Sequence, residues 1–156
     1  MIILGIDPGT TRIGYGLIEK KNGLRLITYG VIEPKGVSQV ERLLTLSREL
    51  RKIIKKHKPT VAGIEKLYFS KNQKTALSVA EARGVITLVV AEEGIPVLEF
   101  GPNEIKSAVT GYGGSDKEAV RKIVALSLGV RTIEGMDDAS DALAIAIRTS
   151  FEKRLF

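Results

Sequence analysis

Short apolar runs separated by turn residues open the chain and predict three neighbouring strands. Residues 2–6 are apolar throughout, which is typical of a strand buried on both faces of a sheet. Residues 15–19 and 24–33 predict two more strands, joined at Lys21-Asn22-Gly23, because Asn-Gly suits the tight turn of a hairpin. The chain is therefore expected to begin with a three-stranded meander.

Helical spacing of apolar residues follows the meander. Ser38 and Glu41 have the spacing of a capping box, and the apolar positions keep helical spacing up to Pro59. This pattern predicts a helix that ends before Pro59. Such a helix is a suitable crossover, so the next apolar run, residues 60–64, is expected to lie parallel to the first strand and near it.

The second half of the chain continues with helical and strand patterns. Apolar positions spread widely around a predicted helix over residues 73–93, which indicates burial against the sheet and against a second surface such as another subunit. The remaining pattern predicts a strand over 95–100, helices over 102–109 and 115–128, and a last helix from 137 to about 153. We expect Ser115 and Glu118 to form a second capping box. The expected core residues of the last helix are Leu143, Ile145, Ala146, Ile147 and Phe151.

These elements predict one α/β domain over residues 1–156, with a five-stranded mixed sheet flanked by helices. The 24 Lys and Arg residues exceed the 18 Asp and Glu residues, a net charge of +6 that favours a polyanionic partner, nucleic acid before an acidic membrane. The absence of cysteine excludes thiol nucleophiles, disulfides and Cys-ligated zinc. His57 lies in a basic run and is expected to be solvated. No apolar run reaches membrane length, so we expect a soluble, cytoplasmic protein.

Two of the buried strands are followed by carboxylates. Asp7 follows the first strand and Glu65 follows the strand over 60–64. An ionised group at the end of a buried strand must be paired, hydrogen-bonded or bound to a cation. Because the two strands are expected to be parallel, both carboxylates should emerge at one edge of the sheet. The alternative for Asp7 is a structural role, in which it caps the turn by accepting from the amides of Gly9 or Thr10.

A second pair of carboxylates opens the last predicted helix. Asp138 and Asp141 are three residues apart and therefore lie on one face of that helix. The alternative is that they satisfy free amides at its N-terminus. If all four acids converge, protonation or metal must relieve their repulsion, and oxygen-only ligands suit Mg²⁺ or Mn²⁺. Basic loops around such a centre are suited to phosphodiester hydrolysis in a nucleic acid.

Several ordered motifs resemble one known family. They are Gly5-Ile6-Asp7-Pro8-Gly9, Gly14-Tyr15-Gly16, Ile64-Glu65, Lys71-Asn72, Ala82-Arg83-Gly84-Val85 and Asp138-Ala139-Ser140-Asp141-Ala142-Leu143-Ala144-Ile145-Ala146. The set resembles the RuvC family of bacterial Holliday junction resolvases over almost the whole chain. The resemblance implies an RNase H-like fold, with three antiparallel strands followed by two parallel ones. It also implies a homodimer that cuts four-way DNA junctions symmetrically in recombination and repair, and that works with the RuvA–RuvB branch-migration complex.

The resemblance also implies roles for individual residues. Asp7, Glu65, Asp138 and Asp141 look like the catalytic carboxylates and the ligands of two Mg²⁺ ions per subunit, which Mn²⁺ can replace. Lys106 and Lys117 match lysines that assist phosphate binding, and Tyr68 or Phe69 matches an aromatic residue that stacks on junction bases. The expected DNA-binding residues are Tyr68, Phe69, Lys71, Lys74, Lys106 and Lys117. Arg83 and Gly84 are expected at the dimer contact rather than in catalysis.

Four alternatives stay open. Lys117 follows a glycine-rich loop in the first turn of a predicted helix, where free amides also favour an anion, but it could be an ordinary surface lysine. Tyr68 and Phe69, flanked by lysines, suit base stacking, but either ring could pack in the core. Asp7, Gly9, Thr10 and Thr11 also fit the phosphate loop of actin-like sugar or acetate kinases, which need two lobes where this chain has the length for one. An inactive junction-binding protein is the last alternative.

Overall fold

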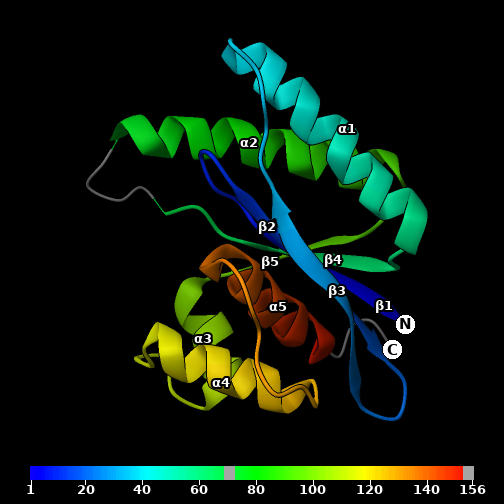
Figure 1. The fold of residues 1–156 in the computed structure, drawn as a ribbon, viewed down its shortest axis with the longest axis vertical. Helices are drawn as coiled ribbons and strands as arrows, with labels where there is room; N and C mark the ends of the chain where they lie inside the picture. The colour runs from blue at the N-terminus through cyan, green and yellow to red at the C-terminus, as the bar shows by residue number, and fades with distance from the viewer. Residues whose placement is uncertain (69–72, 153–156) are drawn as a thin grey trace.

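A five-stranded mixed sheet lies at the centre of the computed structural model, which describes residues 1–68 and 73–152 (Figure 1). Its strands run in the order β3-β2-β1-β4-β5. The pairs β1–β2 and β2–β3 are antiparallel, and the pairs β1–β4 and β4–β5 are parallel. The strands span β1 Ile2–Asp7, β2 Ile13–Lys20, β3 Leu24–Ile32, β4 Val61–Glu65 and β5 Val97–Phe100. This arrangement confirms the predicted meander and the expected RNase H-like fold.

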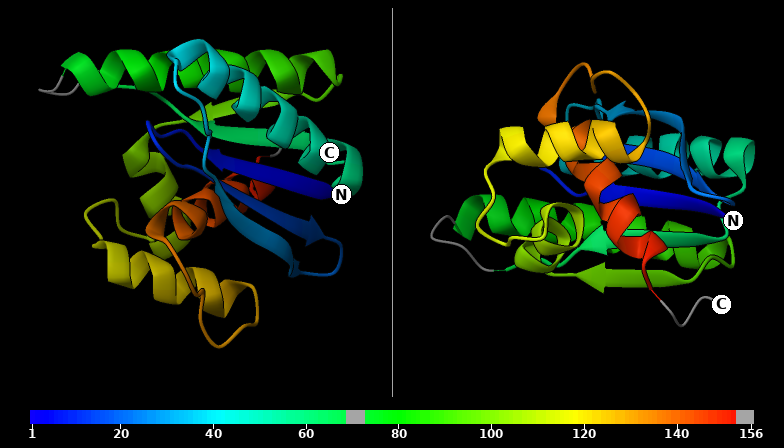
Figure 2. Two further views of the ribbon diagram at one scale, coloured as in Figure 1. Left: turned by 45° about the horizontal axis from the view of Figure 1, so that its top comes forward. Right: turned by 90° about the horizontal axis from the view of Figure 1, so that it is seen from below.

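Helices cover both faces of the sheet (Figures 1 and 2). The first two helices lie on one face, where they pack over a core that includes Leu4 and Leu17, and the last three lie on the other, over a core that includes Ile3 and Leu143. The helices span α1 Gln39–His57, α2 Gln73–Glu92, α3 Pro102–Thr110, α4 Lys117–Ser127 and α5 Asp137–Ser150. No helix within the described ranges is both long and apolar enough to cross a membrane.

The ends of α1 follow the predicted signals. The Ser38 side chain accepts from the backbone amide of Glu41, and the Glu41 carboxylate accepts from the backbone of residue 38, so the capping box is confirmed. The helix ends at His57, and its C-cap Lys58 adopts the left-handed conformation with φ of 50° directly before Pro59. As expected, α1 is the crossover that places β4 parallel to β1.

Two local predictions are wrong. The N-cap of α4 is Asp116 rather than Ser115: its carboxylate accepts from the amide of Ala119 at 2.8 Å, while the Ser115 hydroxyl donates to the Tyr112 carbonyl. A charged acceptor complements the free amides of a helix N-terminus better than a hydroxyl that already has partners. At the other end of the chain, α5 stops at Ser150, so Phe151 leaves its apolar face and is 53% exposed instead of lying in the core.

Glycines on the sheet allow α5 to pack against its strands at backbone distance. A Cβ atom on Gly5 of β1 would overlap the carbonyl oxygen of Ala142, and one on Gly14 of β2 would overlap that of Asp138. On β4, a Cβ on Gly63 would overlap Oγ1 of Thr149. The helix therefore lies directly on β1, β2 and β4, and no larger residue fits between them.

We predict that Gly63→Ala lowers the free energy of unfolding by about 1–3 kcal/mol, as overpacking of a tight interior does. The overlap at this position is with a side-chain atom, so Thr149→Ala should restore part of the loss in the double variant. Gly5→Ala should be at least as damaging and should resist such rescue, because its overlap is with backbone. Urea unfolding gives the free energy of unfolding of the wild type, the two glycine variants and the double variant. A Gly63→Ala variant as stable as the wild type would contradict this account of the packing.

Candidate active site

The two strand-end carboxylates lie at one edge of the sheet. β1 ends at Asp7 and β4 ends at Glu65, and the parallel register pairs Ile6 with Ile64, immediately before them. Both side chains are partly buried. Within the described residues, neither Gly9 nor Thr10 donates a hydrogen bond to Asp7, so the turn-capping alternative for this carboxylate is not supported.

Helix α5 brings the second pair of acids to the same edge. Gly14 pairs with Asp7 across β1 and β2, and the carbonyl of Asp138 lies against Gly14. The backbone at the start of α5 is thereby held beside the end of β1. The N-cap of α5 is Met136, without a side-chain cap, and the carboxylates of Asp138 and Asp141 face basic side chains rather than free amides. The capping alternative therefore does not describe these two acids.

The electrostatics of the cluster show that the four acids influence one another. Burial, followed by the charges of Asp141, Glu65 and Asp138, raises the pKa of Asp7 to about 8. Burial is also the largest cause of the raised pKa of Glu65 and of Asp141. A side-chain hydrogen bond with Asp7 opposes the rise in the pKa of Glu65. The two strand-end carboxylates are therefore best satisfied when Asp7 is protonated and donates to Glu65.

A cavity of about 280 Å³ opens beside the cluster. Lys106 of α3 and Lys117 of α4 line it together with Glu65 and Asp141, and the other residues of its lining are apolar. Lys106 and Lys117 both lower the pKa of Glu65. The structure thus brings together both lysines and two of the acids that the sequence singled out, in a space where an anionic group would meet positive charge.

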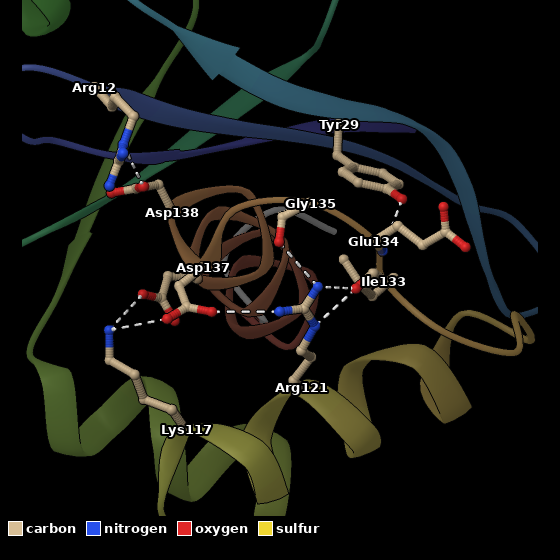
Figure 3. A network of polar contacts seen from close by, with 10 residues as sticks. Arg12, Tyr29, Lys117, Arg121, Ile133, Glu134, Gly135, Asp137 and Asp138 are labelled. Carbon is tan, nitrogen blue, oxygen red and sulfur yellow. Dashed lines mark hydrogen bonds and ion pairs between the residues drawn. The ribbon is translucent and has the colours of Figure 1, made fainter.

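Lys117 is the first residue of α4 and faces the start of α5. Its Nζ lies 3.7 Å from Oδ2 of Asp141 and 4.0 Å from Oδ2 of Asp137 (Figure 3). The side chain is 71% exposed. It is therefore positioned by the acid cluster rather than being an isolated surface lysine, and it remains accessible from solvent.

Arg121, one turn further along α4, holds the segment that leads into α5 (Figure 3). Its guanidinium donates to the carbonyl of Ile133 at 2.7 Å and to that of Gly135 at 3.1 Å, and it lies 3.3 Å from the carboxylate of Asp137. On the other side of this segment, the Tyr29 hydroxyl of β3 accepts from the amide of Glu134 at 3.2 Å. These contacts fix the entry to α5, which has no capping side chain of its own.

Sequence reasoning did not identify Arg12, Tyr29 or Arg121. Arg12 comes from the turn between β1 and β2, and its Nε donates to Oδ2 of Asp138 at 3.1 Å. The helical position of Arg121, four residues after Lys117, places both on one face of α4 and is the one signal that could have linked them. Arg12 and Tyr29 meet partners more than 100 residues away, which no local pattern indicates.

The acid cluster has the donor chemistry of a divalent-cation site. Its ligands would be carboxylate oxygens, and their mutual repulsion is the condition that a bound cation relieves. As they stand, no three acidic or histidine side chains in residues 1–68 and 73–152 are arranged to hold an ion. Two of the four acids instead face cations of the chain, Asp138 facing Arg12 and Asp141 facing Lys117.

The aromatic loop is described in part. Tyr68 is 60% exposed and lines a second cavity, of about 530 Å³, with residues 101–104. Core packing of this ring, the alternative to base stacking, is therefore wrong. Lys74 is exposed at the start of α2. Phe69 and Lys71 lie outside the described residues.

The two α2 residues expected at a dimer contact differ in environment. Arg83 donates to the carbonyl of Glu65 at 3.4 Å and pairs with the carboxylate of Glu99, so its side chain is engaged within the subunit. By contrast, a side chain at Gly84 would meet open space.

Comparison with known proteins gives consistent matches. The family model described as crossover junction endodeoxyribonuclease RuvC matches residues 3–149. The protein of that description from Chloroflexus aggregans is 50% identical over 149 residues, which cover 94% of this chain and 91% of that protein. The one from Petrotoga mobilis is 49% identical over 148 residues, again 94% and 91% of the two chains. The structure of Thermus thermophilus RuvC in complex with Holliday junction substrate matches with a TM-score of 0.92 and 29% identity, covering 99% of this chain and 96% of that one.

We predict that the metal-free protein loses stability as the pH rises from about 4 to about 8. Over this range folded Asp7 keeps a proton that it releases on unfolding, because its pKa of about 8 in the folded protein exceeds the ordinary value of 3.8. The folded state then binds more protons than the unfolded state, so the free energy of unfolding must fall with pH.

Asp7→Asn removes this titration, so the variant should depend less on pH and be more stable than the wild type at pH 8. Urea unfolding in the presence of a chelator measures both proteins from pH 5 to 8. The free energy of unfolding of the variant should still fall with pH, but less steeply, because the pKa values of Glu65 and Asp141 are also raised. Parallel profiles for the two proteins would contradict the assignment to Asp7.

Proposed function

The chain belongs to the RuvC family of crossover junction endodeoxyribonucleases, and from this premise we propose that it resolves four-way DNA junctions by hydrolysing phosphodiester bonds at the cluster of Asp7, Glu65, Asp138 and Asp141. The observation that carries this assignment is that two parallel strands and the start of α5 place acids at one edge of the sheet, beside a cavity lined by Lys106 and Lys117. The raised pKa of Asp7, which burial causes first and the neighbouring acids second, supports it. A protein retains such a cluster at a cost in stability, which favours a functional role over a structural one.

The carboxylates would hold Mg²⁺, two ions per subunit, with Mn²⁺ as a substitute. In phosphodiester hydrolysis such ions activate a water molecule and stabilise the leaving oxygen. Asp7, at the centre of the cluster, would contact both ions, with Glu65 and Asp141 as further ligands. Asp138 would bind an ion or orient the attacking water. The products would carry a 5′-phosphate and a 3′-hydroxyl.

Basic and aromatic residues around the cluster would hold the DNA. Lys106 and Lys117 line the cavity beside Glu65 and Asp141, where they can pair with phosphate oxygens. The exposed ring of Tyr68 borders the neighbouring cavity and is available for base stacking. Lys74, exposed at the start of α2, would contribute to the same DNA surface. Phe69 and Lys71 stay DNA-binding candidates on the family resemblance alone.

A second copy of the chain would supply the second cut. The substrate has two-fold symmetry, so paired cuts call for a homodimer. Helix α2 offers an apolar surface for it: Leu77 and Leu88 are 64% and 58% exposed, about three turns apart on one side of the helix, and Gly84 lies between them with open space around its Cα. The absence of a side chain at Gly84 would let two helices approach closely.

The family assignment also sets the proposed biological role. It favours recombination and DNA repair, in the cytoplasm and together with the RuvA–RuvB branch-migration complex. It decides against the actin-like kinase that the residues around Asp7 allowed, because the family match runs over residues 3–149. A junction-binding protein that does not cut is an outcome of the experiment below.

We predict that Asp7→Asn abolishes cleavage of a four-way junction while leaving fold and junction affinity intact. The amide is nearly the same size as the carboxylate but supplies no negative charge for a cation. The measurement is cleavage of an end-labelled synthetic junction in Mg²⁺, beside a linear duplex of the same sequence, with binding measured in Ca²⁺. The wild type should make paired, symmetric nicks in the junction alone. Tight binding without cleavage by the wild type in Mg²⁺ or Mn²⁺ would contradict the proposed activity.

We predict that Leu88→Glu produces a folded monomer at micromolar concentration, where the wild type is a dimer. Burying a charge at an apolar helix contact is unfavourable, whereas the exposed position tolerates it within one subunit. Leu126→Glu on α4 is the matched control, because Leu126 is 74% exposed and lies away from α2. Light scattering distinguishes the outcomes. A wild type that is monomeric, or a Leu88→Glu variant that stays dimeric, would count against this interface.

A further inference from the structure

Arg12 reaches into the acid cluster from the turn between β1 and β2 (Figure 3). Its Nε donates to Oδ2 of Asp138 at 3.1 Å, and the two side chains are 45% and 25% exposed. Within this turn, Gly9 lies so close to the carbonyl of Arg12 that a Cβ would not fit between them. The turn therefore brings Arg12 to Asp138 from the end of β1, beside Asp7.

Each acid at the start of α5 faces a cation from another part of the fold. Asp137 faces Arg121 and Lys117, and Asp141 faces Lys117, all across the gap to α4. Among the described residues, Arg12 is the basic side chain that lies within 4.0 Å of Asp138. It comes from the turn after β1 and not from α4. The strand-end acids Asp7 and Glu65 have no such ion pair within the described residues.

We propose that Arg12 is a positioning residue of the active site that competes with a divalent cation for the carboxylate of Asp138. This inference rests on the proposed function, in which Asp138 belongs to the cation site. Arg12 neutralises Asp138 when no cation is bound, and cation binding at this carboxylate requires the pair to open.

The character of the ion pair suits a displaceable partner. A guanidinium keeps its charge at all relevant pH values, so it cannot leave the carboxylate by losing a proton. The pair is open to solvent on the Arg12 side, and ion pairs of this kind are weak enough to exchange. A divalent cation near Asp138 would also repel the positive charge of Arg12 at short range, so the two cannot share the carboxylate without cost.

The experiment is a calorimetric titration of the DNA-free protein with Mn²⁺. Arg12→Gln should bind Mn²⁺ roughly three- to tenfold more tightly than the wild type, because it removes both the competing hydrogen bond and the repulsive charge. Arg12→Lys keeps the charge and should stay close to the wild type. In the Asp138→Asn background, Arg12→Gln should have a much smaller effect, since the carboxylate for which the arginine competes is absent.

Arg25→Gln is the matched control. It removes the same unit of charge and a similar exposed ion pair, with Glu19 at 2.9 Å, but Glu19 pairs with Ile2 at the opposite end of β1 from Asp7. Its Mn²⁺ affinity should equal that of the wild type. Thermal unfolding without Mn²⁺ verifies that each variant is folded, and the added stabilisation by Mn²⁺ gives a second measure of affinity.

The outcomes separate this proposal from the proposed function. Equal Mn²⁺ affinity in the wild type and Arg12→Gln would overturn the competition and leave the cation site standing, with the Arg12–Asp138 contact reduced to an ordinary exposed ion pair. Weaker binding by Arg12→Gln would overturn it as well. Failure of every protein, wild type included, to bind Mn²⁺ would overturn the cation site itself and this inference with it.

Discussion

The close contact between α5 and the sheet is the constraint on which the site depends. Gly5, Gly14 and Gly63 lie on three adjacent strands, and each allows backbone or side-chain atoms of α5 to occupy the place of a Cβ. Interiors are packed too tightly for such a contact to be partly made. The helix therefore has one position across β2, β1 and β4. Both the distance of its first turn from the sheet and the direction of its axis are set by this contact.

This contact determines where the acids meet. Asp7 lies two residues beyond Gly5, and Glu65 lies two residues beyond Gly63, so each carboxylate follows the contact along its own strand. The start of α5 is held against Gly14, the residue that pairs with Asp7. Three elements thus deliver acids to one position although burial and repulsion oppose it, as the raised pKa of Asp7 shows. Packing elsewhere in the fold offsets that local cost.

Local patterns predicted the parts of this design that arise within single elements. An apolar run that ends in a carboxylate is visible at Asp7 and Glu65, and the crossover helix between them predicts that their strands are parallel. The ends of helices were less predictable: Asp116 and Ser115 both suit an N-cap, and the hydroxyl of Ser115 is instead engaged by Tyr112 and Thr110 in the preceding loop. Arg12 and Arg121 could not be found, because their partners are distant in sequence and surface arginines are common in a basic chain.

The excess of basic residues also has a role before any partner arrives. A folded chain must hold several carboxylates together in the absence of a cation or DNA, and unpaired, partly buried charges would destabilise it. Protonation relieves Asp7, where burial is greatest, while Lys117 and Arg12 face the more accessible acids of α5. The two means of neutralisation differ in reversibility. In the proposed cation site, a cation that binds Asp7 would displace a proton, whereas a cation that binds Asp138 would displace the side chain of Arg12. The proposed site would then combine a titrating carboxylate with ion pairs that exchange partners.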